Sequence, residues 1–222
     1  MPRVPFLLGL TGNIACGKST VGQLLVERHG AEYIDADRVV HALYAAGTAE
    51  TSAIGSRFGQ DLLQADGTID RRRLGDLVMA DRAALRDLER ILDPGVRRAI
   101  EDRFAISTAA VVVLDAIRLV EGGLYKRCDA VWVVICDPEL QLARLQSSRN
   151  FTRAQASLRV AAQAPVQDKL RHATAVITNN GSLADLEAEV DAAWHRTVAP
   201  NVSTPDIGGL RAEPHEKSSP SL

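Results

Sequence analysis

The stretch Gly12-Asn13-Ile14-Ala15-Cys16-Gly17-Lys18-Ser19 decides the fold, because it places two glycines five positions apart and follows them with Lys and Ser. This spacing is that of a P-loop, in which backbone N–H groups surround phosphate oxygens. Glycine permits the backbone angles that such a loop needs. Lys18 supplies a point charge for the β- and γ-phosphates of a nucleotide, and the Ser19 hydroxyl is a ligand for Mg²⁺. The residues assigned to nucleotide binding are therefore Gly12, Asn13, Ile14, Ala15, Cys16, Gly17, Lys18, Ser19 and Thr20.

The segments on either side of this loop have the composition that a P-loop requires. Residues 6–11 form a short apolar run suited to a buried parallel strand, and residues 20–26 carry apolar side chains at helical spacing. The N-terminus of such a helix presents unpaired N–H groups and a positive dipole end to the phosphates. A glycine-rich turn with a solvated lysine is the alternative, and the order of strand, loop and helix favours the P-loop.

Length, composition and charge bound the class of protein. The 222 residues, 46% apolar and 24% charged, are typical of one globular domain with appendages. A net charge of −2 provides no overall field for nucleic acid or an anionic membrane, and no apolar run reaches the roughly 20 residues that cross a bilayer. We therefore expect a cytoplasmic protein without nucleic-acid or membrane partners. Cys16, Cys128 and Cys136 are odd in number and lack zinc-site spacing, which argues against a disulfide framework and a zinc site.

Two acidic residues follow the second expected strand, residues 31–35. Asp35 ends this strand, and Asp37 lies in the first turn of the helix expected from residue 36. Ligands bind at the carboxyl ends of strands in open α/β sheets, so both carboxylates are candidates for catalysis. Helix capping by Asp35 and a favourable helix-dipole interaction of Asp37 explain the same residues without catalysis, and the spacing leaves both interpretations open.

A third acid ends another apolar strand. Residues 109–115 are an apolar run that closes with Asp115, as does the Walker B element of nucleotide hydrolases and kinases. This pattern predicts that Asp115 holds Mg²⁺ or its water molecules. The assigned metal ligands are Ser19, Asp37 and Asp115.

Apolar runs alternate with helical segments along the chain, which predicts an α/β fold with a parallel five-stranded sheet flanked by helices. The runs are residues 6–11, 31–35, 109–115, 130–136 and 173–178. Residues 43–107 have helical periodicity and exceed a bare crossover in length, so we expect a subdomain for a second substrate. Its basic run Arg71-Arg72-Arg73 either meets phosphates of that substrate or is a solvated face.

A second helical insertion, residues 139–171, is rich in cations that would close over a triphosphate as a lid and neutralise charge during transfer. These are Arg144, Arg149, Arg153, Arg159, Lys169 and Arg171. A helical hairpin with solvated arginines is the alternative. After a last amphipathic helix over residues 183–194, residues 199–222 gather Pro, Ser, Gly and charge, so we expect a disordered tail.

Several segments together resemble the dephospho-CoA kinase family, over about residues 6–194. They are Leu10-Thr11-Gly12 leading into Gly17-Lys18-Ser19-Thr20, Ile34-Asp35-Ala36-Asp37, Asp66-Gly67-Thr68, Leu119-Val120-Glu121-Gly122-Gly123-Leu124-Tyr125 and Thr178-Asn179-Asn180-Gly181-Ser182. Residues 149–163 also resemble the lid of that family, an arginine followed by a Thr-containing turn and a helix that ends in Arg-x-x-x-Gln. Asp93-Pro94 and Ala116-Ile117-Arg118-Leu119 depart from the family's usual residues, near where the acceptor would lie.

The resemblance implies a P-loop kinase fold of the nucleoside-monophosphate-kinase type. It implies that the chain transfers the ATP γ-phosphate to the ribose 3′-hydroxyl of dephospho-CoA, with ATP and Mg²⁺ bound. Asp37 would be the base that orients this hydroxyl, Arg144 and Arg149 would be lid arginines, and Asn180 would lie at the nucleotide. The expected catalytic residues are Asp37, Lys18 and Arg149.

The expected kinase domain covers residues 1–198, and the expected tail covers residues 199–222. Its core lies at residues 5–42, 108–138 and 172–198, between which lie the helical acceptor insertion, residues 43–107, and the lid, residues 139–171. Two other functions remain open, a kinase acting on another small hydroxyl compound and a nucleotide-binding regulatory protein without transfer activity. Lys18, Ser19 and Asp37 together with the lid arginines favour the enzyme, which we expect to be a monomer or a weak homo-oligomer.

Overall fold

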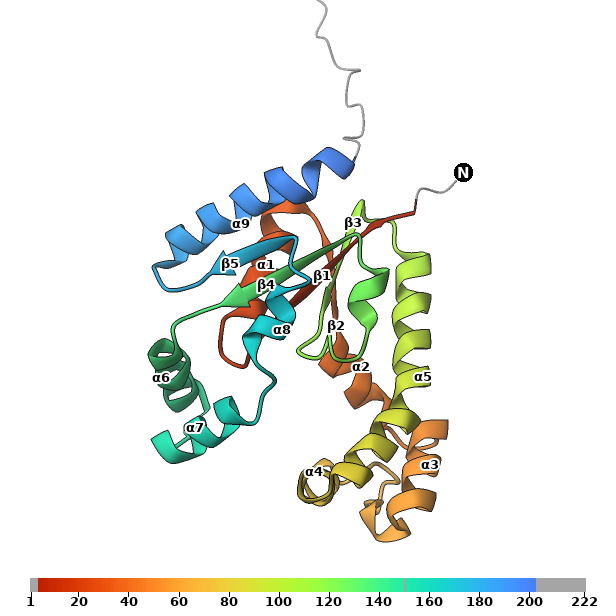
Figure 1. Cartoon of the computed structure of the whole chain (residues 1–222). Coiled ribbons are helices and arrows are strands. Elements are labelled where there is room, and N and C mark those ends of the chain that lie inside the picture. Colours follow the sequence, from red (N-terminus) through yellow and green to blue (C-terminus); the bar gives the residue numbers. More distant parts are fainter. Residues whose placement is uncertain (1–3, 150, 203–222) are drawn as a thin grey trace, which may run out of the picture.

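A parallel sheet forms the centre of the protein (Figure 1). The structure, a computed structural model, describes residues 4–149 and 151–202, without the side chains of Ser148 and Arg149. In this part of the chain the five strands have the order β2-β3-β1-β4-β5, and all pairs are parallel. They are β1 (Phe6–Gly12), β2 (Glu32–Asp35), β3 (Val111–Asp115), β4 (Ala130–Ile135) and β5 (Ala175–Thr178). The expected α/β fold and five-stranded parallel sheet are confirmed.

The middle strand β1 leads directly into the P-loop. Six of its seven residues are buried, as its continuous apolar run predicts for a strand covered on both faces. It pairs with β3 on one side, where Leu10 is opposite Asp115, and with β4 on the other, where Gly12 is opposite Val134. Because all strands are parallel, the P-loop and the acidic ends of β2 and β3 meet at one edge of the sheet.

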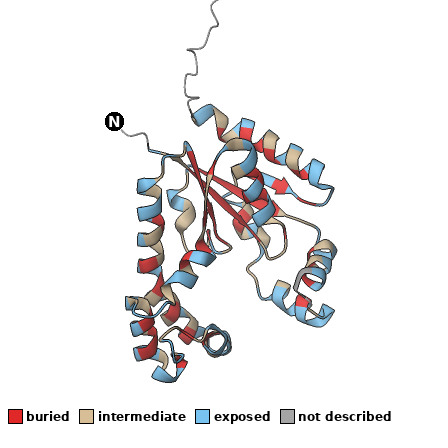
Figure 2. Ribbon diagram, turned by 180° about the vertical axis from the view of Figure 1, so that it is seen from behind, coloured by how far each residue is buried: buried red, intermediate tan, exposed pale blue. Residues whose placement is uncertain are grey.

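Helices cover both faces of the sheet. On one face, α1 (Lys18–His29) and α9 (Leu183–Thr197) pack against the strands through Val21, Leu25, Val190 and Trp194. On the other face lie α2 (Ala36–Leu43), the C-terminal half of α5 (Arg82–Ile106) and α8 (Val166–Leu170). Figure 2 shows the buried strands between these two helical layers. A 3-10 helix, η2 (Leu124–Arg127), lies before β4.

The acceptor insertion forms a helical unit with its own core. It contains α3 (Ala49–Phe58), the 3-10 helix η1 (Gln60–Leu62), α4 (Arg71–Ala80) and the N-terminal half of α5. Ile54, Leu74 and Leu88 are buried together in this unit. Farther along α5, Ile100 packs on the sheet instead. One helix of 25 residues therefore joins the insertion to the core.

The expected lid projects from the carboxyl edge of the sheet as α6 (Pro138–Arg149) and α7 (Arg153–Ala161). Thr152 begins α7 with a capping box, in which its side chain accepts from the Gln155 N–H and Gln155 accepts from the Thr152 N–H. Figure 1 shows α6 and α7 on one side of the molecule, below the sheet, and the insertion helices α3 and α4 on the other.

The described chain continues past residue 198, the expected end of the domain, and the domain bounds stay a prediction. Residues after α9 form a 3-10 helix, η3 (Ala199–Asn201), and Ala199 and Val202 pack against the main core beside the buried Val198. Three apolar side chains are too few to show periodicity in a sequence, but they suffice to fix one turn. The rest of the expected tail, residues 203–222, lies outside the described residues.

Among residues 4–149 and 151–202, no helix combines the length and the apolar character that crossing a membrane requires.

Candidate active site

The P-loop has the backbone conformation that its glycines predict. The φ angles of Gly12, Ala15 and Gly17 are 149°, 59° and 95°, and Gly17 directly precedes α1 as its N-cap. A Cβ on Gly12 would overlap the Val134 carbonyl oxygen, and a Cβ on Gly17 would overlap the Asn179 side chain. Both positions therefore require glycine, because φ is positive and there is no room for a Cβ atom. The backbone N–H groups at the start of α1 lie at the helix N-terminus, where an anion is favoured.

Side chains from the lid region and from the end of β5 hold this loop in place. Gln141 on α6 donates to the Ile14 carbonyl oxygen at 2.6 Å, and the Ile14 N–H donates to the Gln163 Oε1 at 2.7 Å. Buried Asn179 donates to the Cys16 carbonyl oxygen at 2.9 Å. These bonds fix both halves of the loop.

A pocket of about 440 Å³ lies over the loop, and we refer to it as the nucleotide pocket. It is lined by Ile14, Ala15, Gly17, Lys18, Ser19, Thr20, Asp35, Asp37, Asp115, Ile117 and Arg144. Most of the residues predicted for nucleotide binding and metal binding are thus brought together. Gly12, Asn13 and Cys16 belong to the loop but do not line this pocket.

The Cys16 thiol is buried behind the loop, where its sulfur lies 3.5 Å from that of Cys136. The hydrogen bond with Cys136 lowers the pKa of Cys16 to about 7, and the Lys18 charge acts in the same direction, while burial opposes both. All three cysteines are described, and all are free thiols.

The three carboxylates at the strand ends have different surroundings. Asp35 caps α2, because its Oδ1 accepts from the N–H groups of Asp37 and Arg38 at 2.9 and 3.1 Å. Asp115 is buried and accepts from the Tyr33 hydroxyl at 2.5 Å. Burial raises the pKa of Asp115, and Lys18 and Tyr33 partly offset this effect. Asp37 is exposed in the first turn of α2, with its helix already capped by Asp35.

This donor set fits a nucleotide with Mg²⁺. Two carboxylates and a hydroxyl, those of Asp37, Asp115 and Ser19, face the pocket, and Mg²⁺ prefers oxygen ligands. Few protein ligands are needed, because Mg²⁺ in kinases usually keeps water and phosphate oxygens as its other ligands. In the part of the chain that the structure describes, no group of three or more His, Cys, Asp or Glu side chains is arranged for a metal held by protein alone.

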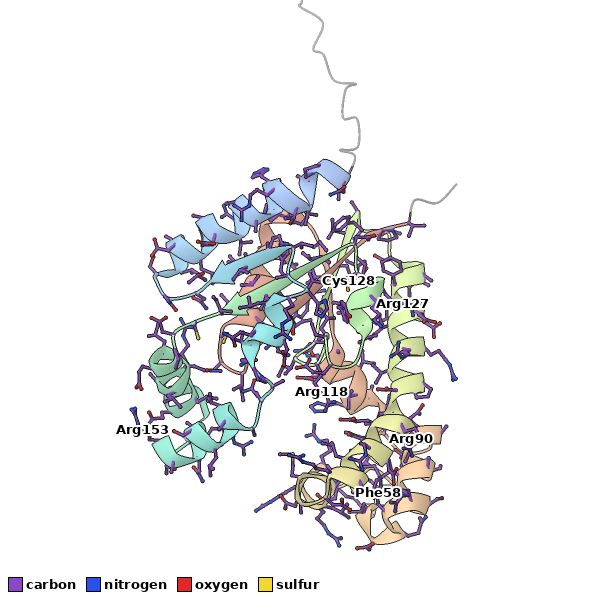
Figure 3. All side chains as sticks on the ribbon, in the orientation of Figure 1. Phe58, Arg90, Arg118, Arg127, Cys128 and Arg153 are labelled. Atoms are coloured by element: carbon purple, nitrogen blue, oxygen red, sulfur yellow. The ribbon has the colours of Figure 1, made fainter. Side chains whose placement is uncertain are left out.

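A second pocket, of about 330 Å³, adjoins the nucleotide pocket between α2, α5 and the segment after β3. Its apolar wall is formed mainly by Val40, Leu85, Leu88, Leu92, Val96 and Leu124. Two arginines, Arg97 and Arg118, line it as well, and Figure 3 places Arg118 between the sheet and the insertion. Its acidic lining residues are Asp37, Glu89, Asp93 and Glu121, of which Glu89 pairs with Arg118. The departures from the family pattern, at Asp93 and residues 116–118, lie on its wall. Among the described residues, only Asp37 and Ile117 line both pockets.

The lid cations do not share one environment. Arg144 lines the nucleotide pocket and donates to the Asn179 carbonyl oxygen at 3.0 Å. Arg153 pairs with Glu139 at 3.0 Å on the outside of the lid (Figure 3). Lys169 is buried against the segment after β3, so its expected place over a triphosphate is wrong. The Arg149 side chain lies outside the described residues, and its role stays a prediction.

Other predicted residues lie away from the two pockets. Asn180 is exposed and exchanges hydrogen bonds of 2.8 Å with Asp137, which bridges the loops after β4 and β5. Its contact with nucleotide stays a prediction. Arg73 pairs with Asp61 at 2.6 Å, and the role of the basic run in substrate binding also stays a prediction.

Sequence reasoning missed Gln141 and Asn179, which hold the P-loop. Asn179 stands next to the assigned Asn180 directly after β5, and burial in the folded chain distinguishes the two. No local pattern marks Gln141. Gln163 was marked by the lid resemblance alone.

A P-loop after the middle strand of this parallel sheet, with acidic strand ends, a helical lid and a second pocket, defines a P-loop kinase. The family model for dephospho-CoA kinase matches residues 6–185. The chain is 40% identical over 191 residues to a dephospho-CoA kinase of Geobacter sulfurreducens, covering 85% of this chain and 96% of that protein. The chain belongs to the dephospho-CoA kinase family, whose members are ATP-dependent kinases.

Solved structures agree with this assignment. A protein from Thermus thermophilus superimposes with a TM-score of 0.76 at 31% identity, covering 87% of this chain and 98% of that one. A dephospho-CoA kinase from Campylobacter jejuni gives a TM-score of 0.64 at 28% identity, covering 88% and 98%.

Proposed function

We propose that this kinase transfers the γ-phosphoryl group of ATP to the ribose 3′-hydroxyl of dephospho-CoA, and that Asp37 orients this hydroxyl. The observation that carries the proposal is the position of Asp37 on the wall shared by the two pockets. Phosphoryl transfer needs donor and acceptor oxygens roughly in line, so the reacting hydroxyl must lie where the pockets meet. Of the two described residues that line both pockets, Asp37 and Ile117, only Asp37 has a titratable side chain.

The donor side is assigned to the P-loop and Lys18. The loop N–H groups and the α1 N-terminus bind phosphate oxygens, and Lys18 contacts the β- and γ-phosphates. Ser19, Asp37 and Asp115 would hold Mg²⁺ or its water molecules. When bound, Mg²⁺ neutralises charge on the phosphates. Arg144 and Arg149 are assigned to the lid side, where guanidinium groups stabilise the negative charge of the transferred group.

The acceptor side is assigned to the second pocket. Its apolar wall suits the uncharged parts of dephospho-CoA, and Arg97 and Arg118 suit its diphosphate. In the reaction the 3′-oxygen bonds to the γ-phosphorus as the bond to the β–γ bridging oxygen breaks. The hydroxyl proton moves to the Asp37 carboxylate, and ADP and coenzyme A leave. Little proton transfer is needed early, because the transition state is loose.

A coupled assay of ADP release with different acceptors tests the substrate. We expect turnover with dephospho-CoA and mass-spectrometric detection of coenzyme A, whereas adenosine and shikimate give only the background rate. Faster turnover of adenosine or shikimate would contradict the proposal and assign another hydroxyl acceptor. ATP binding without transfer to any acceptor would contradict it in favour of a regulatory nucleotide-binding protein. The cytoplasmic location and the monomeric or weakly associated state stay predictions.

A further inference from the structure

Lys169 is a buried lysine to which the reaction described above gives no role. It lies on α8, and its side chain is only 2% exposed. Its Nζ donates to the Ile117 carbonyl oxygen at 2.7 Å and to the Glu121 Oε1 at 2.6 Å. A buried ammonium group is costly unless it is paired and hydrogen-bonded, and these two acceptors meet that need.

The Ile117 carbonyl oxygen is held from two sides. Besides Lys169, the Thr11 hydroxyl donates to it at 3.1 Å, and Thr11 is the buried residue of β1 that immediately precedes the P-loop. Ile117 lines both pockets, and Glu121 lines the second pocket. The two donors therefore fix the wall between the pockets relative to β1 and to α8.

The segment that carries Lys169 also contacts the P-loop. Gln163, before α8, accepts from the Ile14 N–H at 2.7 Å. The short stretch from Gln163 to Lys169 thus contacts the nucleotide site at one end and the wall of the second pocket at the other.

We propose that Lys169 is a positioning residue for the second substrate, which it serves by fixing the Ile117 carbonyl and Glu121 on the wall of the second pocket. This inference rests on the proposed function, because it takes the second pocket as the site of dephospho-CoA. The nucleotide keeps its own ligands in the P-loop, so the effect falls mainly on the acceptor.

The first test compares Lys169→Met with the wild type. Methionine keeps an unbranched side chain but removes both hydrogen bonds. We expect the KM for dephospho-CoA to rise about 10-fold or more, since small displacements near a reacting group have effects of this size or larger. The KM for ATP and the Kd of a fluorescent ATP analogue should stay within about twofold. Lys126→Met is the matched control, because Lys126 is an exposed lysine on η2 that lines neither pocket.

A double variant separates positioning from simple charge compensation. Lys169→Met leaves the Glu121 carboxylate without its ammonium partner, whereas Lys169→Met with Glu121→Leu leaves no charge at the site and should restore the melting temperature. It does not restore the hydrogen bond to Ile117, so the KM for dephospho-CoA should remain raised. If the single variant fails to fold, the double variant supplies the same comparison.

A KM for dephospho-CoA within twofold of wild type in the folded variants would overturn the inference and leave Lys169 a structural residue. Recovery of both stability and KM in the double variant would overturn it as well. The wild type is measured in the same series. If the wild type does not phosphorylate dephospho-CoA, the proposed function fails, and this result is distinguishable from a failure of the inference.

Discussion

Asp35, Asp37 and Asp115 have the same side chain, and their surroundings give them different properties. Asp35 and Asp115 are opposite each other in the register of β2 and β3. The Asp35 carboxylate is engaged as a helix cap, while Asp115 is buried beside Tyr33. The N-cap of α2 is Asp35, so helix capping does not account for Asp37, which lines both pockets. Residue type and spacing therefore indicate a site, and burial and hydrogen bonding distinguish the roles within it.

The first prediction concerns Asp115 and Mg²⁺. Asp115→Asn keeps the size of the side chain and an acceptor for the Tyr33 hydroxyl but removes the negative charge. We expect the Mg²⁺ concentration for half-maximal activity to rise about 10-fold or more, the scale on which groups around a metal affect its affinity. Titration of activity with Mg²⁺ at saturating ATP measures this. An unchanged Mg²⁺ requirement would remove Asp115 from the metal site.

At the scale of elements, one ion-pair cluster joins the two helices that cover the first face of the sheet. Arg28, at the end of α1, donates to both carboxylate oxygens of Asp191 on α9, at 3.1 and 2.5 Å. The His29 Nε2 lies 2.9 Å from the same carboxylate, and its ring stacks on Trp194. The hydrogen bonds from Arg28 lower the pKa of Asp191.

The second prediction is that Asp191→Asn weakens this contact between α1 and α9 in a pH-dependent way. The pKa of Asp191 is lower in the folded state, so its stabilising effect is present above the unfolded-state value of about 3.9 and disappears as pH falls through the folded-state value. Because the pair is partly exposed, we expect a fall in melting temperature on the order of 1–3 °C at pH 7.

Melting curves at pH 7 and pH 3 test this prediction, with Asp102→Asn as a control for an exposed carboxylate elsewhere, on α5. The difference between Asp191→Asn and wild type should shrink at the lower pH. A difference that is equal at both pH values would contradict the electrostatic explanation.

At the scale of the whole molecule, the site lies between parts that pack separately. The insertion has a core of its own, and the lid contacts the P-loop mainly through Gln141 and Gln163. The nucleotide pocket and the second pocket lie between these parts at the carboxyl edge of the sheet. Ligand binding therefore adds contacts between these parts of the molecule.

The third prediction is that ATP with Mg²⁺ stabilises the folded protein. At 100 times its Kd, a ligand that binds only the folded state adds about 2.7 kcal/mol, which corresponds to roughly 5–10 °C in melting temperature for a domain of this size. Lys18→Ala should lose most of this shift, because its charge contacts the phosphates. Lys126→Ala removes an exposed lysine and should keep it. An equal shift in all three proteins would contradict the assignment of the P-loop.

The sequence predicted features that depend on local patterns. The P-loop is specified by residue spacing, and the strands by short apolar runs, so the sheet and its flanking helices followed correctly. Asp37, Lys18 and Ser19 were placed because they lie next to these patterns. Their position on one pocket is observed, whereas their roles stay proposals.

Features that depend on tertiary contacts were not predictable in this way. Lys169 lies among the cations of the second helical insertion, so its sequence position suggested a lid cation. Only the folded chain shows that its ammonium group donates to the Ile117 carbonyl oxygen. Asn179 and Asn180 are adjacent and chemically equal, and only the folded chain shows that the first is buried against the P-loop and the second exposed. Asp37 borders both pockets because α5 returns from the insertion to the sheet, which no local pattern specifies.

Steady-state kinetics of Asp37→Asn test whether Asp37 orients and deprotonates the acceptor hydroxyl. Asparagine preserves the shape of the side chain and removes its charge and basic oxygen. Glu50→Gln is the matched control, because Glu50 is also a first-turn helix acid, on α3 and outside both pockets. We expect kcat with dephospho-CoA to fall about 100-fold or more in Asp37→Asn, with a normal melting curve and unchanged ATP affinity, while Glu50→Gln stays near wild type. Full turnover in folded Asp37→Asn would contradict the account.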